Sequence, residues 1–300
     1  MGKNRLGAYM RMMVMIINVI VTALVMGGIY VLIAIGLNLQ YGVARVLNIA
    51  YGEFIMLGAF ITWELVAKYG INPMVSLLVS GPVVSLIGYI LYKTVFTRIR
   101  NTSASNEIFE SNSLLAAFGL IYIIQNIAIL IWGSGIRGYA FETSPLAVGG
   151  ISIPTNQVIM LIFALIIGLL FYLFLTRSRL GKAIRAASCD PIAAGLMGID
   201  MHRVLSICFA LGALMAGFAG SLLSTSFAIN AAMGFDYAII GIVVIVLGGL
   251  GNIMGSFAGG FLLSLVDAIV KLIEPSLSML AFYLLFMLVL IIKPSGILGK

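Results

Sequence analysis

The chain has 300 residues, of which 62% are hydrophobic and only 9% are charged. This composition is too apolar for a soluble protein, whose core is wrapped in a polar surface, and it predicts an all-α integral membrane protein. The net charge of +7 does not indicate nucleic-acid binding, because the lysines and arginines lie in short connections between apolar runs, as in the loops of membrane proteins.

Six apolar runs are long enough to cross a hydrocarbon core of about 30 Å as helices. The first follows Lys3, Arg5 and Arg11 and resembles the start of a signal peptide. It continues without a clear cleavage site, so we interpret it as an uncleaved first membrane helix. The predicted spans cover about residues 12–39, 74–96, 113–132, 156–176, 203–229 and 277–292.

The connection at 177–203 is the densest positive loop of the chain, which places it in the cytoplasm. If the basic N-terminus and the C-terminus are cytoplasmic too, residues 40–67 and 237–272 must each enter the membrane and return. The sequence thus predicts about 8 membrane segments, two of them broken or re-entrant. The alternative is that each of these segments is one tilted helix, with glycines that serve close packing.

Glycines and polar residues occur in both segments where an ordinary span has neither. Irregular backbone at membrane depth is tolerated where protein or a water-filled cavity satisfies its hydrogen bonds, and such breaks commonly line transport paths. The candidate residues of a translocation path are Asn38, Gln40, Arg45, Asn48, Tyr51, Glu53, Gly248, Gly249, Gly251 and Asn252.

Ionisable residues within membrane segments are functional candidates by default. Arg45 and Glu53 either line or gate a path, or they form a satisfied structural pair. Asp267 lies one turn before Lys271, which favours an ion pair at a helix end. The small residues at every fourth position, Gly212, Ala216, Gly220 and Gly251, Gly255, Gly259, are typical of close helix packing.

Signatures of catalysis and of metal binding are absent from the sequence. His202 is the sole histidine, and Cys189 and Cys208 show no metal or redox spacing. Gly181-Lys182-Ala183 lacks the leading glycine and the hydroxyl residue of a phosphate-binding loop. We therefore expect no enzyme activity, no metal and no cofactor bound by this chain.

The basic loop contains the signals of a short helix. Asp190 is a good N-cap, Pro191 suits the first helical position, and Gly198 suits the position after the end, so a helix is predicted at about 191–197. A short helix held between two membrane spans can be gripped by a soluble partner. From these residues alone, a docking element and a solvated connector remain equal alternatives.

The stretch "LGKAIRAASCDPIAAGLMGIDMHRV", followed by "FALGALMAGFAGSLL", resembles the permeases of ABC importers of the branched-chain amino acid class, specifically the LivH-type subunit. The resemblance extends to "GLNLQYGVARVLNIAYGEFIMLGAF", "VLGGLGNIMGSFAGGFLL" and "KPSGILGK". These blocks span nearly the whole chain, so residues 1–300 are expected to form a single transmembrane permease domain with its coupling loop at about 177–203.

The resemblance implies a bacterial inner-membrane importer for branched-chain or other hydrophobic amino acids. Its expected partners are a LivM-type permease, two cytoplasmic ATPases that carry ATP-Mg, and a periplasmic binding protein. In this family the loop is a cytoplasmic coupling helix that docks on the ATPase, although Arg185-Ala186-Ala187 stands where many importers have Glu-Ala-Ala. The implied coupling residues are Gly181, Arg185, Asp190, Pro191, Ala194, Gly195 and Gly198.

Two alternatives of another kind remain. A secondary transporter or channel for a small polar solute would work without an ATPase, but the few carboxylates are poorly placed for ion coupling. A permease of the same class for urea or short amides would share the fold and the partners.

Overall fold

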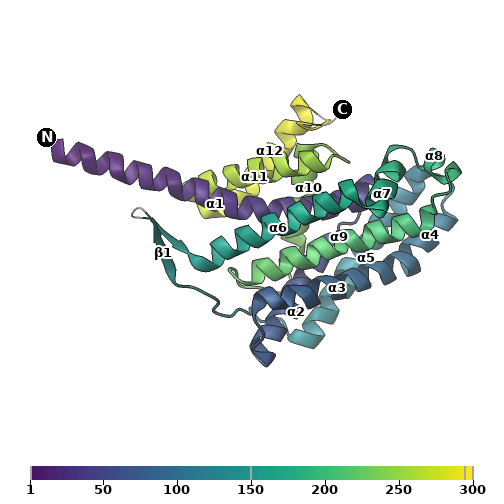
Figure 1. The fold of residues 1–300 in the computed structure, drawn as a ribbon, viewed down its shortest axis with the longest axis horizontal. Helices are drawn as coiled ribbons and strands as arrows, with labels where there is room; N and C mark the ends of the chain where they lie inside the picture. The colour runs from purple at the N-terminus through teal and green to yellow at the C-terminus, as the bar shows by residue number, and fades with distance from the viewer. Residues whose placement is uncertain (1, 149–150, 294, 299–300) are drawn as a thin grey trace.

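The computed structural model describes residues 2–148, 151–293 and 295–298, which form a bundle of helices and one small hairpin (Figure 1). The strands β1 (Pro145–Val148) and β2 (Ile151–Pro154) pair antiparallel. The helical elements are α1 (Gly2–Gly42), α2 (Tyr51–Tyr69), α3 (Pro73–Leu91), the π-helical turn η1 (Tyr92–Phe96), α4 (Thr97–Thr102), α5 (Asn106–Trp132), α6 (Thr155–Arg177), α7 (Arg179–Cys189), α8 (Pro191–Leu196), α9 (Met201–Ser224), α10 (Met233–Gly248), α11 (Ile253–Ile273), the 3-10 turn η2 (Pro275–Leu277) and α12 (Ser278–Ile292).

The predicted all-α membrane fold is confirmed. In the described part of the chain, 7 helical segments are long and apolar enough to cross a membrane. Two further helices share the bundle: α2, which carries Glu53, Glu64 and Lys68, and α10, which has only 16 residues. Both are largely buried against other helices, which allows them to be more polar or shorter than a span that faces lipid.

The bundle has two distinct ends. Figure 1 shows α7 and α8 at one end, which we call the loop end, and the β1–β2 hairpin at the other, which we call the hairpin end. Helix α1 starts at the hairpin end and reaches the loop end, where Tyr41 and Gly42 line a cavity together with Arg185 of α7. The two ends of α1 thus lie on opposite sides of the bundle.

This direction of α1 corrects the prediction for residues 40–67. The segment is not a broken span: it consists of the end of α1, a loop at 43–50, and one uninterrupted helix, α2, whose first turn already lies inside the bundle, where Gly52 packs against the Gly234 carbonyl of α10. The prediction assumed that the first helix begins on the side of the basic loop, and the start of α1 instead lies at the far end (Figure 1). The start of the chain therefore lies at the opposite end from the basic loop, whereas Leu298, near the C-terminus, lines the same cavity as Arg185.

The second broken segment is present. Helices α10 and α11 are separated at residues 249–252, where Gly249 and Gly251 have φ values of +101° and +80°. The Asn252 side chain caps α11 by accepting a hydrogen bond from the Gly255 N–H at 3.1 Å. One tilted helix is thus excluded for 237–272, and the predicted break is confirmed as a tight turn at the loop end.

Glycines allow the central helices to approach closely, as the four-residue spacing predicts. A Cβ on Gly212 would meet the Gly36 carbonyl oxygen of α1 at 2.6 Å, and a Cβ on Gly220 would collide with the Ile55 carbonyl oxygen of α2. On α11, Gly259 has the same relation to Val244 of α10, at 2.6 Å. Because these neighbours are backbone atoms, they cannot move aside for a side chain.

The turn η1 continues α3 into α4. Tyr92 and Phe96 of this turn both pack on Phe209 of α9, with ring centroids 5.4 and 5.1 Å away. Beyond the turn, the Arg100 guanidinium donates a hydrogen bond to the Ala44 carbonyl and lies 4.0 Å from the centre of the Phe109 ring. The wide turn therefore directs a basic side chain onto the loop that follows α1.

Candidate functional site

The predicted coupling segment forms two consecutive helices at the loop end. Ser178 caps α7, and its Oγ accepts a hydrogen bond from the Gly181 N–H at 2.8 Å. Gly181 is buried, and a Cβ there would collide with the backbone of Leu175 at the end of α6. Arg185 donates to the Thr176 carbonyl at 3.3 Å. These contacts hold α7 firmly against α6.

Helix α8 has the caps that the sequence predicts. The Asp190 Oδ1 accepts hydrogen bonds from the N–H groups of Ile192 and Ala193 at 2.9 and 3.0 Å, and Pro191 takes the first helical position. Helix α8 ends at Leu196, Met197 is its C-cap, and Gly198 follows with a φ of +84°. The predicted range of 191–197 is confirmed to within one residue. Ala194 is buried, whereas Gly195 borders open space.

The outer side of α8 is apolar and unprotected. Ile192, Leu196 and Met197 are 78%, 85% and 84% exposed, respectively. Ile192 and Leu196 are four residues apart and share one helix face. Large apolar side chains on a polar loop form an exposed apolar patch, which is typical of interaction sites.

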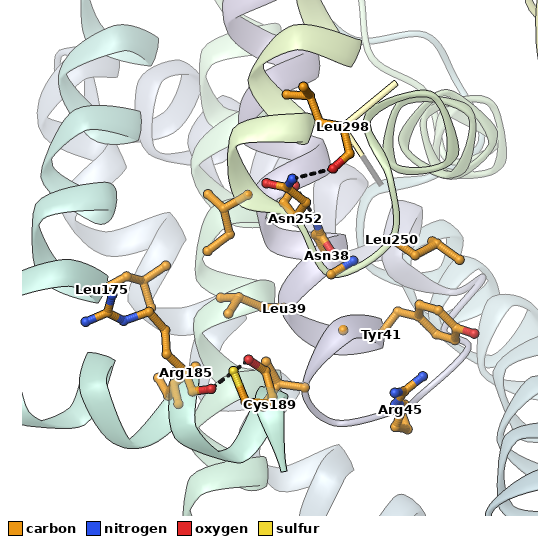
Figure 2. A pocket seen from close by; sticks show the side chains of 16 residues that line it. Asn38, Leu39, Tyr41, Arg45, Leu175, Arg185, Cys189, Leu250, Asn252 and Leu298 are labelled. Atoms are coloured by element: carbon orange, nitrogen blue, oxygen red, sulfur yellow. Dashed lines mark hydrogen bonds between the residues drawn. The ribbon is translucent and has the colours of Figure 1, made fainter. Parts of the chain in front are cut away.

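A cavity of about 550 Å³ at the loop end brings one predicted coupling residue, Arg185, together with four predicted path residues, Asn38, Arg45, Gly251 and Asn252. Figure 2 shows Arg185 of α7 and Arg45 of the loop after α1 on opposite sides of it in this view, with Asn38 and Asn252 above and between them. Gly251 of the α10–α11 turn also lines the cavity. Arg185 and these four path residues thus share one space, and the other predicted coupling and path residues lie outside it.

Asn38 is the polar centre of this cavity wall and is only 3% exposed. Its Nδ2 donates to the Asn252 carbonyl at 3.0 Å and to the Ser256 Oγ at 2.9 Å, while its Oδ1 accepts from the Gly251 N–H at 2.7 Å. The Asn252 side chain in turn donates to the Leu298 carbonyl at 2.9 Å. One amide therefore ties α1 to the α10–α11 turn.

The other buried polar candidates do not line this cavity. Gln40 donates to the Phe209 carbonyl at 3.1 Å and accepts from the Asn48 Nδ2 at 2.8 Å. The Tyr51 hydroxyl is fully buried beside Gly36 and has no hydrogen-bond partner among the described residues. Glu53 is 2% exposed and opens onto a second, smaller cavity.

The possible pair of Arg45 and Glu53 does not form. Arg45 is exposed, with a positive φ of 54°, while Glu53 is buried, and the salt bridges among described residues are those of Lys68 with Glu64 and of Lys271 with Asp267. Gly248 does not line the first cavity either: a Cβ there would collide with the Gly255 carbonyl of α11, so its role is packing. The neighbouring Gly249 supplies the positive φ of the turn.

Some polar contacts have no signal in the local sequence. The predicted ion pair of Asp267 and Lys271 is confirmed at 2.6 Å, but Asp267 also accepts from the Tyr30 hydroxyl at 3.1 Å, across 237 positions. At the hairpin end, the Tyr139 hydroxyl oxygen lies 3.0 Å from the Ser224 Oγ. Burial raises the pKa of the Tyr139 hydroxyl to about 12. Such partners depend on the tertiary fold.

Comparison with known proteins places these features among transport proteins. Residues 19–291 match the model of the family described as "Branched-chain amino acid transport system / permease component". The permease protein BraD of Pseudomonas aeruginosa is 30% identical, over 94% of this chain and 95% of BraD.

Two Escherichia coli permease proteins of high-affinity branched-chain amino acid transport are also similar. LivH is 30% identical over 92% of both chains. LivM is 26% identical over 90% of this chain and 68% of LivM. The chain thus resembles both LivH and LivM, with the higher identity to LivH.

Proposed function

Because the chain belongs to the family of branched-chain amino acid transport system permease components, we propose that it is the LivH-type permease subunit of an ATP-driven importer. The importer moves branched-chain or other hydrophobic amino acids inward by alternating access. A LivM-type permease completes the pair, two cytoplasmic ATPases bind ATP-Mg, and a periplasmic protein delivers the substrate. This chain itself holds no cofactor and catalyses no reaction.

The observation that carries this proposal is the exposed apolar face of α8. The exposed residues are Ile192, Leu196 and Met197. They lie on a short helix that residues directly before and after it cap. A preorganised helix loses little conformational freedom on docking, so its apolar side chains can contribute most of their burial energy to a partner. An ATPase subunit on the same side of the membrane is the partner that the proposed function requires.

Movement of a docked α8 has a direct route to the cavity. The Asp190 N–H donates to the Ala186 carbonyl of α7 at 3.1 Å, while the Asp190 side chain caps α8, so the two helices are joined through one residue. Ile184 and Cys189 of α7 line the cavity together with Asn38. A shift of α7 thus changes the space in which Asn38 ties α1 to the α10–α11 turn.

Charge supports the orientation in the membrane. The loop end carries the basic connection at 177–203, so we place it in the cytoplasm of a bacterial inner membrane, following the positive-inside rule. The hairpin end then faces the periplasm and the binding protein. In this orientation α1 begins outside, and its first basic residues are an exception to the rule.

The test combines co-purification with uptake. The tagged permease should bring its ATPase subunits through purification. Proteoliposomes that hold the full complex, with the binding protein added outside, should accumulate labelled leucine only with internal ATP-Mg. Leu196→Glu should abolish both association and uptake, because a carboxylate would be buried at the docking surface. Leu196→Met, which keeps an apolar side chain of similar size, is the matched control.

Other outcomes would redirect the assignment. Uptake driven by an ion gradient without ATP would contradict the importer and support a secondary transporter. ATP-dependent uptake of urea or a short amide in place of leucine would keep the mechanism and change the substrate.

A further inference from the structure

A second cavity, of about 260 Å³, lies between α2, α5 and the start of α10. This volume is just below the range of about 300–1,000 Å³ that is typical of small-molecule sites, which suits a ligand of one amino acid's size. Its walls are mostly apolar and aromatic, with two polar side chains beside Glu53. The lining residues used below are Glu53, Phe118, Ile121, Tyr122, Gln125 and Phe235.

Glu53 lacks a counter-charge. The residue is 2% exposed, and its Oε2 is buried without a hydrogen-bond partner among the described residues. A buried carboxylate without a partner is costly, and proteins normally pair such groups or bind a cation with them. The residues that line the cavity include no lysine, arginine or histidine, so they do not supply a positive charge.

The fold leaves room for this carboxylate. A Cβ on Gly234, at the start of α10, would lie 2.6 Å from the Glu53 Oε1 and 2.7 Å from its Cδ. The Glu53 side chain therefore lies flat against a glycine, and any other residue at 234 would push it away. The same glycine contacts α2 through its carbonyl oxygen, against which Gly52 packs.

We propose that Glu53 binds the α-ammonium group of an amino acid in this cavity, an inference that rests on the proposed function and names the substrate contact. The ammonium group supplies the missing positive charge and donates to the carboxylate. The Gln125 amide is placed to donate to the substrate carboxylate. Phe118, Ile121 and Phe235 offer apolar walls to an aliphatic side chain.

This assignment separates ligands by their charge. Leucine and leucinamide both carry the ammonium group and should bind, whereas 4-methylpentanoate has the same aliphatic chain without it and should not. A hydrogen bond to a charged group contributes more than a neutral one, so losing it should weaken binding roughly tenfold or more.

The experiment measures binding of labelled leucine to the complete permease–ATPase complex in nanodiscs, without the binding protein. Leucinamide should compete and 4-methylpentanoate should not. Glu53→Gln should raise the dissociation constant roughly tenfold or more, and Glu53→Asp, which keeps the charge, should restore part of the affinity.

Two further variants guard against a mere folding defect. Gly234→Ala displaces the carboxylate without changing any charge, and because the atoms in its way are the flexible end of a side chain, the complex should still assemble and bind leucine less well. Glu64→Gln removes a carboxylate that pairs with Lys68 at the other end of α2, and it should bind leucine as the wild type does.

Several results would overturn the inference: wild-type affinity in Glu53→Gln, competition by 4-methylpentanoate equal to that by leucine, or no leucine binding by the wild-type complex. Each of these is compatible with ATP-dependent leucine uptake by the wild type. If the wild-type complex instead fails to take up leucine with ATP and its binding protein, the proposed function itself is wrong.

Discussion

The loop end and the centre of the bundle are held together by different means. Helix α8 is defined by its own caps, Asp190 and Gly198, and exposes its apolar side chains. The central helices α1, α2, α9, α10 and α11 are held by backbone-to-backbone contact at glycines and by buried amide hydrogen bonds between distant residues. Substitutions at these packing contacts and buried amides should therefore affect folding, whereas substitutions in α7 and α8 should affect transport in a protein that still folds.

The largest loss of stability is expected for Gly220→Val, since its Cβ would collide with the Ile55 carbonyl of α2. Overpacking against backbone should lower the free energy of unfolding by about 3 kcal/mol or more. The melting temperature of the purified protein and its yield in the membrane measure this loss. Gly119→Val, on α5 where a Cβ meets nothing within 4 Å, is the control, and equal melting of the two variants would refute the importance of the contact.

A smaller loss is expected for Asn38→Leu, which removes the acceptor of the Gly251 N–H and the donor to the Ser256 Oγ. Loss of these hydrogen bonds should cost about 2 kcal/mol, and release of the α10–α11 turn should also slow transport. Unfolding and uptake assays test both effects. Asn126→Leu removes an exposed amide that bonds only within α5, so a comparable loss there would show that the Asn38 contacts are unimportant.

At the loop end, Asp190→Ala should lower the local stability of α8 by about 1 kcal/mol, because the N–H groups of Ile192 and Ala193 lose their acceptor. Hydrogen exchange of the α8 amides should accelerate while the melting temperature of the bundle hardly changes. Asp190→Asn, which can still cap, should exchange like the wild type. Global unfolding of the alanine variant would contradict the separation of the two regions.

The smallest effect on stability is expected for Arg185→Glu. This exposed side chain makes one hydrogen bond to Thr176, so the free energy of unfolding should change by no more than about 0.5 kcal/mol. Uptake and transport-linked ATP hydrolysis should nevertheless be lost, since Arg185 lines the cavity at the coupling segment. Arg179→Glu makes the same charge change outside the cavity; equal loss in both variants would point to overall loop charge instead.

The same contrast explains what the sequence could predict. The bounds of α8 and the Asp267–Lys271 pair depend on neighbours within a few positions, so caps and helical spacing sufficed for both. The course of residues 40–67 depends on which way α1 runs, a property of the whole bundle. The count of charges gave the wrong direction for α1. The interpretation of residues 40–67 as a segment that enters and returns followed from that direction, so it was wrong as well.

The candidate site shows the same limit. Polar residues in the two glycine-rich segments were recognised because they are rare in apolar surroundings, yet their partners could not be inferred. Asn38 meets Ser256 across 218 positions, and Glu53 meets Gly234 rather than Arg45. Only the packing of α1, α2, α10 and α11 determines which of these side chains are satisfied and which are left for a ligand.

The π-helical turn at Tyr92–Phe96 has a consequence for inherited variation. A turn of this kind holds one residue more than an α-helical turn, so a one-codon deletion within it could restore regular α-helix. The residues of the wide turn cover about the same rotation as an α-helical turn with one residue fewer, so everything after the deletion would keep its direction relative to α3. A one-codon deletion within α3 itself would instead rotate everything after it by about 100° and take Arg100 away from Ala44 and Phe109. The wide turn is thus a place where the chain can lose one residue and keep α4 connected to the loop after α1.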